Sequence, residues 1–450
     1  MSIENAIKDE AVQFLAGAQM SSKKTLVPAG YKRTEVGIIP DDWDAIDLGF
    51  AIRLQRGFDL PHRSRRKGDV PIVSSAGVSG FHDEWKVSSP GVVTGRYGTI
   101  GQVFFVEENF WPLNTTLYVK DFIRTSPLYT FHFLKTINFE SHSGKSGVPG
   151  VNRNDLHQEK IAIPPADEQT AIANALSDAD ALIMCLENLI TKKQAIKTAT
   201  MQQLLTGRTR LLQFRLCEDR TPTNSSDTNG NGRKSLRKGY KSSEFGDIPE
   251  DWTIVPLSAL VSEHSAGVYK PKSSYGDGVN IVGVGDIYNI SKVDGSIYRR
   301  VPLSKGERER FSLEVGDLIY GESSLVREGI ARTIYVDEGG AGTAFAWHTR
   351  RFKVDQRKVD SKFLYYFLDS FVARCHMVNS SITTALTGIN TVAYFSCPIL
   401  LPEKKEQVAI ATILSDIEEE TRALEQRLTK ARQIKQGMIQ QLLTGRTRLV

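Results

Sequence analysis

The sequence is poor in cysteine, and its cysteines form no recognisable set. Their spacing contains no CxxC pair and no Cys/His cluster of the kind that holds zinc. Few cysteines without a disulfide framework are typical of a reducing compartment, so we expect a cytoplasmic protein without a bound metal. The four residues are Cys185, Cys217, Cys375 and Cys397.

Long apolar runs are missing as well. No stretch of about 18 apolar residues occurs, which excludes a membrane-spanning helix. Residues 1–20 carry Glu4, Asp9 and Glu10 and lack the basic-then-apolar order of a secretory signal. Apolar residues still form 40% of the chain, as in ordinary globular proteins, and 450 residues are too many for one hydrophobic core. We therefore expect about two to four domains.

A strong excess of charge is absent, and so are catalytic signatures. The net charge of +5 permits a nucleic-acid partner without demanding one. The glycine-rich segment Gly95–Gly101 has no helix-like segment after it, so we expect a hairpin rather than a phosphate loop. Ser143–Ser146 resembles the end of a Walker A loop, but Phe139 stands where its first glycine would be. Gly283–Gly285 lacks the third glycine of a dinucleotide fingerprint.

What the chain does contain is a repeat. The segment Gly30–Trp43 returns as Gly239–Trp252, and Gln202–Leu211 returns as Gln440–Leu449. We call these repeated segments the frame. The stretches between them differ in length and sequence, so the chain reads as two like modules with unlike inserts. Such a design suits a protein that recognises two different targets with one geometry.

Two long helices are predicted near the ends of the modules. Residues 167–205 contain neither Pro nor Gly, prolines precede both helices, and Gly207 and Gly445 follow them as C-cap glycines. Apolar residues recur at the spacing of a coiled-coil seam, and a charged residue such as Glu168 is expected to matter less than these positions. The seam residues are Ile172, Leu176, Ala179, Ile183, Leu186 and Ile190, then Ile410, Leu414, Ile417, Leu424, Leu428, Ile434, Met438 and Leu442.

The predicted fold class is α+β. We expect two mixed α/β domains joined by the two long helices, which pack antiparallel as a coiled coil with an internal pseudo-two-fold repeat. The alternative is that each helix folds back on its own domain. The predicted segments are an N-terminal arm (1–29), a first body (30–163), a first long helix (164–210), a polar linker (211–238), a second body (239–400) and a second long helix (401–450).

Both bodies read as short strands between turns. Runs rich in β-branched residues occupy 70–73, 91–94, 101–106 and 115–119, while 128–139 and 361–377 look helical. Trp43 and Trp252 stand at one frame position beside a proline. They could stack on bases, but a tryptophan repeated in a frame is more often a core anchor.

Basic residues gather on the loops of both bodies. Lys and Arg neutralise phosphates, Arg also bonds guanine edges, and Asn reads adenine in the same bidentate manner. For any one residue a solvated charge is the plain alternative, so the argument rests on clusters that recur in both bodies. The predicted DNA-binding residues are Arg56, Arg63, Arg65, Arg66, Lys67, Arg96, Tyr97, Asn114, Lys145, Arg153, Lys270, Lys272, Arg327, Arg350 and Asn390.

The frame and its companions resemble a known family. Besides the repeated entry and exit segments, Gly150–Asn152 is mirrored by Gly388–Asn390, and Glu168-Gln169 is mirrored by Glu406-Gln407 at the start of the second helix. In this order, and twice, these motifs are similar to those of the DNA-specificity (S) subunits of type I restriction–modification systems. The resemblance covers the chain after residue 29.

This resemblance implies a function. Two target-recognition domains would each read one half of an asymmetric bipartite double-stranded DNA site, and the paired helices would set the spacer and dock two modification subunits. S-adenosylmethionine, ATP and Mg would act in the modification and restriction subunits, because this chain has none of the methylation or helicase motifs and is expected to be non-catalytic. The bodies differ at equivalent places, as in Gly95–Thr99 against Gly321–Leu325, so the half-sites should differ too.

Two alternatives remain at the level of the sequence. One is a coiled-coil scaffold whose two bodies bind proteins or glycans. The other is an autonomous nuclease that uses Glu84 and Lys86, which match half of a metal-dependent nuclease pattern that is common by chance.

Overall fold

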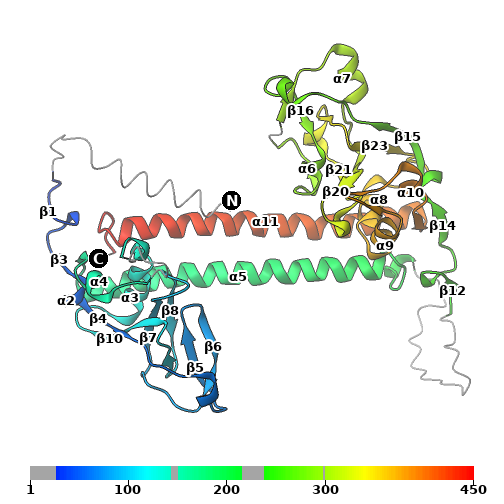
Figure 1. Ribbon diagram of the computed structural model, residues 1–450. Coiled ribbons are helices and arrows are strands. Elements are labelled where there is room, and N and C mark those ends of the chain that lie inside the picture. The colour runs from blue at the N-terminus through cyan, green and yellow to red at the C-terminus, as the bar shows by residue number, and fades with distance from the viewer. Residues whose placement is uncertain (1–26, 143–149, 215–237, 297–298, 450) are drawn as a thin grey trace, which may run out of the picture. The chain divides into compact units, whose positions relative to one another are not determined.

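A computed structural model describes residues 27–142, 150–214, 238–296 and 299–449 (Figure 1). Contacts divide the chain into two units, and the first unit draws on both ends of the sequence. The first unit combines Met1–Leu186 with Arg427–Val450, and the second is Glu187–Gln426. Most of the predicted arm and linker lies outside the described residues.

The first body is a set of small sheets with short helices. Its helices are α2 (Leu48–Ala51), α3 (Pro127–Leu134) and α4 (Arg153–His157), with 3-10 turns η1 (His62–Ser64) and η2 (Phe139–His142). Its strands are β1 (Tyr31–Thr34), β2 (Gly37–Pro40), β3 (Asp44–Asp47), β4 (Ile52–Arg56), β5 (Val70–Ser74), β6 (Gly77–His82), β7 (Gly91–Gly95), β8 (Val103–Val106), β9 (Trp111–Pro112), β10 (Thr116–Phe122) and β11 (Lys160–Ile163).

The main sheet of the first body has the order β4-β10-β7-β8, beside a smaller sheet β6-β5-β9. All four predicted strand runs are confirmed, as β5, β7, β8 and β10. The hairpin predicted at 95–101 is confirmed as well, because β7 and β8 pair antiparallel with Thr94 opposite Val103. The helix predicted over 128–139 is shorter, since α3 ends at Leu134.

The second body is larger but built in the same way. Its helices are α6 (Val284–Ile287), α7 (Lys305–Phe311), α8 (Ser361–Leu368), α9 (Phe371–Asn379) and α10 (Thr391–Phe395), with 3-10 turns η5 (Leu257–Ala259), η6 (Lys272–Ser274), η7 (Arg327–Gly329) and η8 (Glu338–Gly340). Its strands are β12 (Tyr240–Ser243), β13 (Gly246–Pro249), β14 (Thr253–Pro256), β15 (Val261–Ala266), β16 (Val279–Val282), β17 (Lys292–Val293), β18 (Arg299–Val301), β19 (Leu318–Gly321), β20 (Ser323–Ser324), β21 (Thr333–Val336), β22 (Ala344–Phe345), β23 (Thr349–Val354), β24 (Ile382–Thr383), β25 (Thr387–Gly388) and β26 (Pro398–Leu401).

The main sheet of the second body has the order β15-β23-β19-β21-β17, with smaller sheets β18-β16-β22 and β20-β25-β24. The helical character predicted over 361–377 is confirmed, but the structure divides the stretch into two helices. α8 ends at Leu368, and Ser370 occupies the N-cap position of α9 in an extended conformation, which breaks the helical path.

The two long helices form as predicted, α5 over Ala166–Leu204 and α11 over Lys404–Leu442. Gly207 and Gly445 follow them with φ of +69°, the left-handed conformation of a C-cap glycine. Space also requires glycine. A Cβ at Gly207 would lie 2.4 Å from Pro249, and one at Gly445 would lie 2.6 Å from Pro40. A further 3-10 turn, η3 (Leu212–Phe214), follows α5.

Within each unit the two helices face one another through ion pairs. In the second unit Lys197 on α5 lies 3.1 Å from Glu418 on α11, and Lys193 pairs with Glu420. In the first unit Asp180 pairs with Lys435. In the second unit, residue numbers therefore rise on one helix as they fall on the other.

The seam positions are covered to different degrees. Ile434 is wrong as a seam residue, because it is 53% exposed while Lys435 turns toward α5 and pairs with Asp180. Buried members are Ile172, Leu176, Leu186, Ile190, Ile410, Leu414 and Leu442, and half-buried members are Ala179, Ile183, Ile417, Leu424, Leu428 and Met438.

The structure is a mixture of helices and sheets, in agreement with the α+β prediction. Each unit has its own main core, and the ends of the long helices contribute to it. Trp43 lies in the core of the first unit with Leu442, and Trp252 lies in that of the second with Leu205. Both tryptophans are fully buried, which confirms that they are core anchors rather than stacking platforms.

Candidate nucleic-acid interface

A buried carboxylate ties the frame of the first unit together. The indole Nε1 of Trp43 donates to Oε2 of Glu168 at 2.8 Å, and Nε of Arg448 donates to Oε1 at 2.7 Å. The remaining guanidinium nitrogens of Arg448 donate to Asp42 at 3.0 and 2.7 Å. These bonds raise the pKa of Arg448 and lower that of Asp42. Glu168 is fully buried, so it is not a charge on the surface of the helix seam, and whether its removal matters less than an apolar change in the seam stays a prediction.

The second unit contains the same arrangement. Trp252 donates to Oε2 of Glu406 at 3.2 Å, and Arg210 donates to Oε1 at 3.1 Å and to Oε2 at 2.7 Å. Arg210 also bonds both oxygens of Asp251, at 3.0 and 2.9 Å. We call each set of tryptophan, glutamate, arginine and aspartate a lock. Each lock joins the entry segment of a body to the segment that follows a long helix.

The glutamine after each lock glutamate has a structural role too. Gln169 donates to the carbonyls of Arg124 and Pro164 at 2.9 and 3.0 Å, and it accepts from the backbone of Ser126. Gln407 bonds the second body in the same way, through the carbonyls of Lys358 and Pro402. The repeated Glu-Gln pair therefore fixes the first turn of each long helix to a body.

Four of the predicted DNA-binding residues of the first body gather around one loop. Arg56 lies 3.5 Å from Asp59, and the side-chain amide of Asn114 donates to the same carboxylate. Thr115 follows Asn114, and its carbonyl accepts from the backbone N–H of Arg96 at 2.8 Å. The guanidinium of Arg96 lies 4.5 Å from the ring centre of Tyr97. This grouping brings together side chains of the types that can read base edges and bind phosphates.

The remaining candidates of the first body differ in availability. Arg66 bonds Asp83 at 2.6 Å and also Glu84, and these carboxylates raise its pKa, so its charge is already balanced. Arg65 is half-buried. Three further candidates are exposed and have no ion-pair partner within the described part of the chain: Arg63, Lys67 and Arg153. Lys145 lies outside the described residues.

The predicted DNA-binding residues of the second body also differ in their surroundings. Lys270 pairs with Glu307 at 2.9 Å and holds the pKa of that carboxyl at about 2, and Arg350 pairs with Glu322. Asn390 caps α10 by accepting from the backbone of Ala393 at 2.8 Å. Lys272 and Arg327 are exposed on short 3-10 turns.

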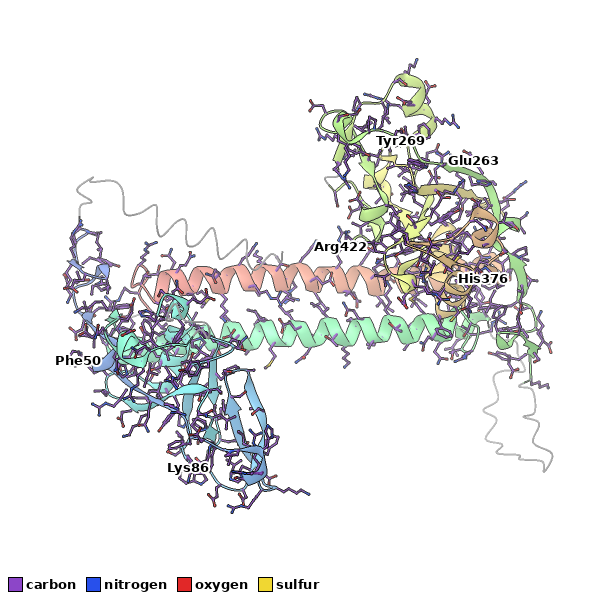
Figure 2. All side chains as sticks on the ribbon, viewed as in Figure 1. Phe50, Lys86, Glu263, Tyr269, His376 and Arg422 are labelled. Carbon is purple, nitrogen blue, oxygen red and sulfur yellow. The ribbon has the colours of Figure 1, made fainter. Side chains whose placement is uncertain are left out.

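Sequence reasoning did not select Asp59, nor the exposed aromatic residues Tyr269 and Trp347 of the second body. Tyr269 and Lys86 are labelled in Figure 2, on the second and first bodies. An aromatic residue in a β-rich segment gives no sequence signal of exposure, because most such residues are buried.

Glu84 and Lys86 do not form a paired acid and lysine. Glu84 bonds Arg66, whereas the ammonium of Lys86 lies 4.8 Å from the ring centre of Trp111. Across the described residues, no group of three or more His, Cys, Asp or Glu side chains is placed to hold a metal ion. None of the described helices combines the length and apolar character that a membrane crossing requires.

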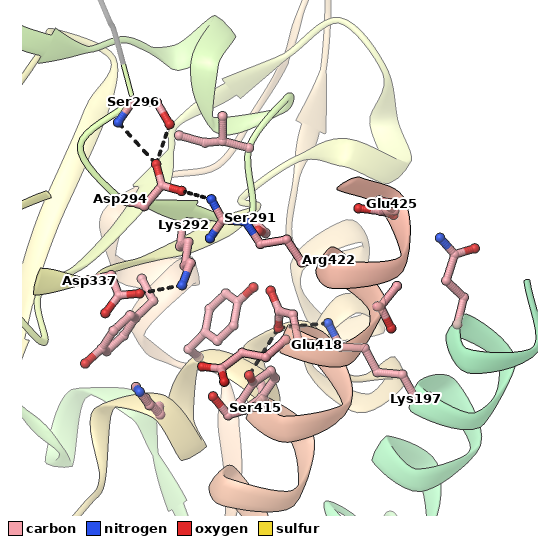
Figure 3. Close-up of a pocket in the computed structure, with 18 of the residues that line it drawn as sticks. Lys197, Ser291, Lys292, Asp294, Ser296, Asp337, Ser415, Glu418, Arg422 and Glu425 are labelled. Carbon is pink, nitrogen blue, oxygen red and sulfur yellow. Dashed lines mark hydrogen bonds and ion pairs between the residues drawn. The ribbon is translucent and has the colours of Figure 1, made fainter. Parts of the chain in front are cut away.

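The second unit contains a cavity of about 590 Å³ between its body and its parts of the long helices (Figure 3). Charged side chains pair across it. Arg422 on α11 bonds Asp294 at 2.6 Å, and Lys197 on α5 bonds Glu418. Desolvation raises the pKa of Asp294, but its bonds to Ser296 and Arg422 prevail and lower it overall. Polar contacts such as the Arg422–Asp294 ion pair therefore line the cavity and attach the second body to α11.

Comparison with known proteins places this architecture. A family model described as "Type I restriction modification DNA specificity domain" matches twice, over residues 40–198 and 249–436. A type I restriction enzyme specificity subunit, MjaVIII of Methanocaldococcus jannaschii, is 25% identical over 91% of this chain and 94% of its own. The StySPI specificity subunit of Salmonella potsdam is 25% identical over 63% of this chain and 57% of its own.

A solved structure agrees on the fold. The crystal structure of a type I restriction-modification S subunit from M. genitalium superposes with a TM-score of 0.59 at 13% identity, covering 94% of this chain and 99% of the other. The two matches to the family model enclose most of both bodies and of both long helices. The chain therefore belongs to the family of type I restriction modification DNA specificity domains, which it contains twice.

Proposed function

We propose that this chain is the DNA-binding specificity subunit of a type I restriction–modification complex. The observation that carries the proposal is the double match of the specificity-domain family, one match for each body. The recurring locks support it, because they give both bodies the same frame around different loops. Each body then acts as a target-recognition domain for one half of a bipartite DNA site.

The two half-sites should differ, because equivalent positions carry different side chains. Arg96 in the first body and Glu322 in the second each follow the last residue of a central strand, and each donates its backbone N–H to the loop beside it, at 2.8 and 3.0 Å. A guanidinium and a carboxylate cannot recognise the same base edge. Exposed Arg and Lys side chains would hold the backbone phosphates and set the register of each body.

The long helices would form an antiparallel coiled coil that sets the spacer between half-sites. The opposite running order of the two ion pairs in the second unit supports this pairing, and the recurrence of the lock in both units supports a pseudo-two-fold repeat. The same helices would dock two modification subunits, and restriction subunits would complete the assembly. In this proposal the chain is non-catalytic, and its partners hold S-adenosylmethionine, ATP and Mg.

One experiment tests the proposal directly. The chain is produced together with its modification subunit in a host without adenine methylation, and every methylated adenine of the host genome is mapped. We expect one asymmetric motif of two short half-sites around a fixed gap, methylated on both strands. An assembled complex that leaves no methylation would refute the proposal.

A further inference from the structure

Both bodies contain the same corner, built where two loops meet. We call it the corner and define it as residues 57–60 with 113–116 in the first body, and 267–270 with 346–349 in the second. The backbone of Phe58 donates to Pro112 at 2.8 Å, and that of Val268 donates to Phe345 at 2.9 Å. The same backbone hydrogen bond therefore joins the two loops in both bodies.

Further backbone contacts extend this match. The N–H of Gly57 bonds the carbonyl of Thr116, and the N–H of Gly267 bonds the carbonyl of Thr349, both at 3.1 Å. A Cβ at Gly57 would lie 2.2 Å from the carbonyl oxygen of Leu113, and one at Gly267 would lie 2.1 Å from the equivalent oxygen. The loops approach so closely that only glycine fits, and this aligns the two corners residue by residue.

The alignment pairs Asp59 with Tyr269 and Asn114 with Trp347, so the two corners present opposite chemistry. In the first body the amide of Asn114 donates to Asp59, which also faces Arg56. In the second body Tyr269 and Trp347 form an edge-to-face pair with ring centres 5.0 Å apart. A polar hydrogen-bonding pair thus stands where the other body has an aromatic pair.

The aromatic pair is exposed to an unusual degree. Tyr269 is 64% exposed and Trp347 is 51% exposed, although large aromatic side chains gain most from burial. His348 stacks on Trp347 with ring centres 4.5 Å apart, and its φ of +67° is a conformation that residues other than glycine rarely adopt. Strained backbone that presents side chains to solvent is typical of binding sites.

The exposed ammonium of Lys272 beside the corner favours DNA as the occupant, whereas that of Lys270 is already paired with Glu307. Lys270 follows Tyr269 directly, and Lys272 is exposed two residues further on. The carbonyl of His348 accepts from the backbone of Glu322, whose carboxylate pairs with Arg350. In the first body the same carbonyl position bonds Arg96, so the corner adjoins the strand end that also differs between the bodies.

We infer that the corner is a specificity-determining site in each body, and this inference rests on the proposed function. In the first body the Asn114 amide and the Asp59 carboxylate would bond base edges, as Asn does with adenine and Asp with the amino group of cytosine. In the second body Tyr269 and Trp347 would contact thymine methyl groups, which are the apolar feature of the major groove. The two bodies thus read different bases through one backbone geometry.

The test uses the full chain in complex with its modification subunit and maps methylated adenines for each variant. Trp347→Ala and Tyr269→Ala should each relax one or more base positions in one half-site, with discrimination there falling about tenfold. Asn114→Ala should relax positions in the other half-site only. Phe371→Ala removes an exposed aromatic side chain of the second body outside the corner and should leave the motif unchanged.

The outcomes separate the inference from the proposed function. Variants that methylate the unchanged motif would overturn the inference, as would a uniform loss of methylation without a change in base preference. If the aromatic variants and Asn114→Ala relax the same half-site, the inference is also wrong. A wild-type complex that yields no bipartite motif would instead refute the proposed function.

Discussion

Removing the lock glutamates should destabilise the two units to different extents. Glu168→Ala and Glu406→Ala each leave a buried indole N–H without its acceptor and an arginine without one of its two carboxylates. Breaking a buried ion pair from one side costs about 3–5 kcal/mol. The Arg448 side chain is 26% exposed and can regain water, whereas that of Arg210 is 4% exposed. We therefore expect a loss of about 3 kcal/mol for Glu168→Ala and nearer 5 kcal/mol for Glu406→Ala.

The assay is urea unfolding of the full chain, with hydrogen–deuterium exchange to assign the loss to a unit. Glu168→Ala should speed exchange in peptides around Trp43, and Glu406→Ala in peptides around Trp252. Asp167→Ala is the matched control, because its exposed carboxylate precedes Glu168 on the same turn, and it should change stability by less than about 0.5 kcal/mol. Equal effects of Asp167→Ala and Glu168→Ala, or exchange that rises equally in both units, would refute the reasoning.

Three further predictions follow from described contacts. Burial lowers the pKa of His132 to about 4 from 6.5, so the unfolded chain binds more protons between these values, and lowering the pH from 7.5 to 5 should cost the first unit about 2 kcal/mol. His132→Asn should flatten that pH dependence of unfolding. Gly445→Ala should destabilise the chain by about 2 kcal/mol, because Cβ meets Pro40 at a positive φ, whereas Gly437→Ala, in the open interior of α11, should be neutral or stabilising in thermal melts. The double variant Arg63→Ala/Lys67→Ala should weaken DNA binding and reduce the salt slope by about two, and an unchanged slope would exclude phosphate contacts at both residues.

The sequence predicted the elements of this fold better than their contacts. The spacing of apolar residues and the positions of Gly and Pro located α5, α11 and the strands of the first body, because these signals are local. The break between α8 and α9 was missed, since no proline or glycine marks it and only the N-cap conformation of Ser370 reveals it. The burial of Glu168 was missed because its partners, Trp43 and Arg448, lie far away in sequence.

For the candidate site, the sequence could predict which residue types are present but not which of them interact. Basic residues on loops could be named, but their partners could not, so Arg66 and Lys270 were selected although each is paired with a carboxylate. The corner was missed for a different reason. Asn114 and Trp347 are recognised as equivalent only by the matching backbone hydrogen bonds of the two bodies. Their side chains are chemically unlike, so the sequence does not align them.

Each body is completed by a segment that the chain delivers from its other half. Arg448, after α11, closes the first body, while Arg210, after α5, closes the second, and both belong to the same repeated sequence. Gene recombination within the repeated frame would therefore exchange one body for another without disturbing either closure. A new pair of recognition loops would meet an arginine already in place, so such a lineage can acquire new specificities by exchanging whole bodies rather than by accumulating point changes.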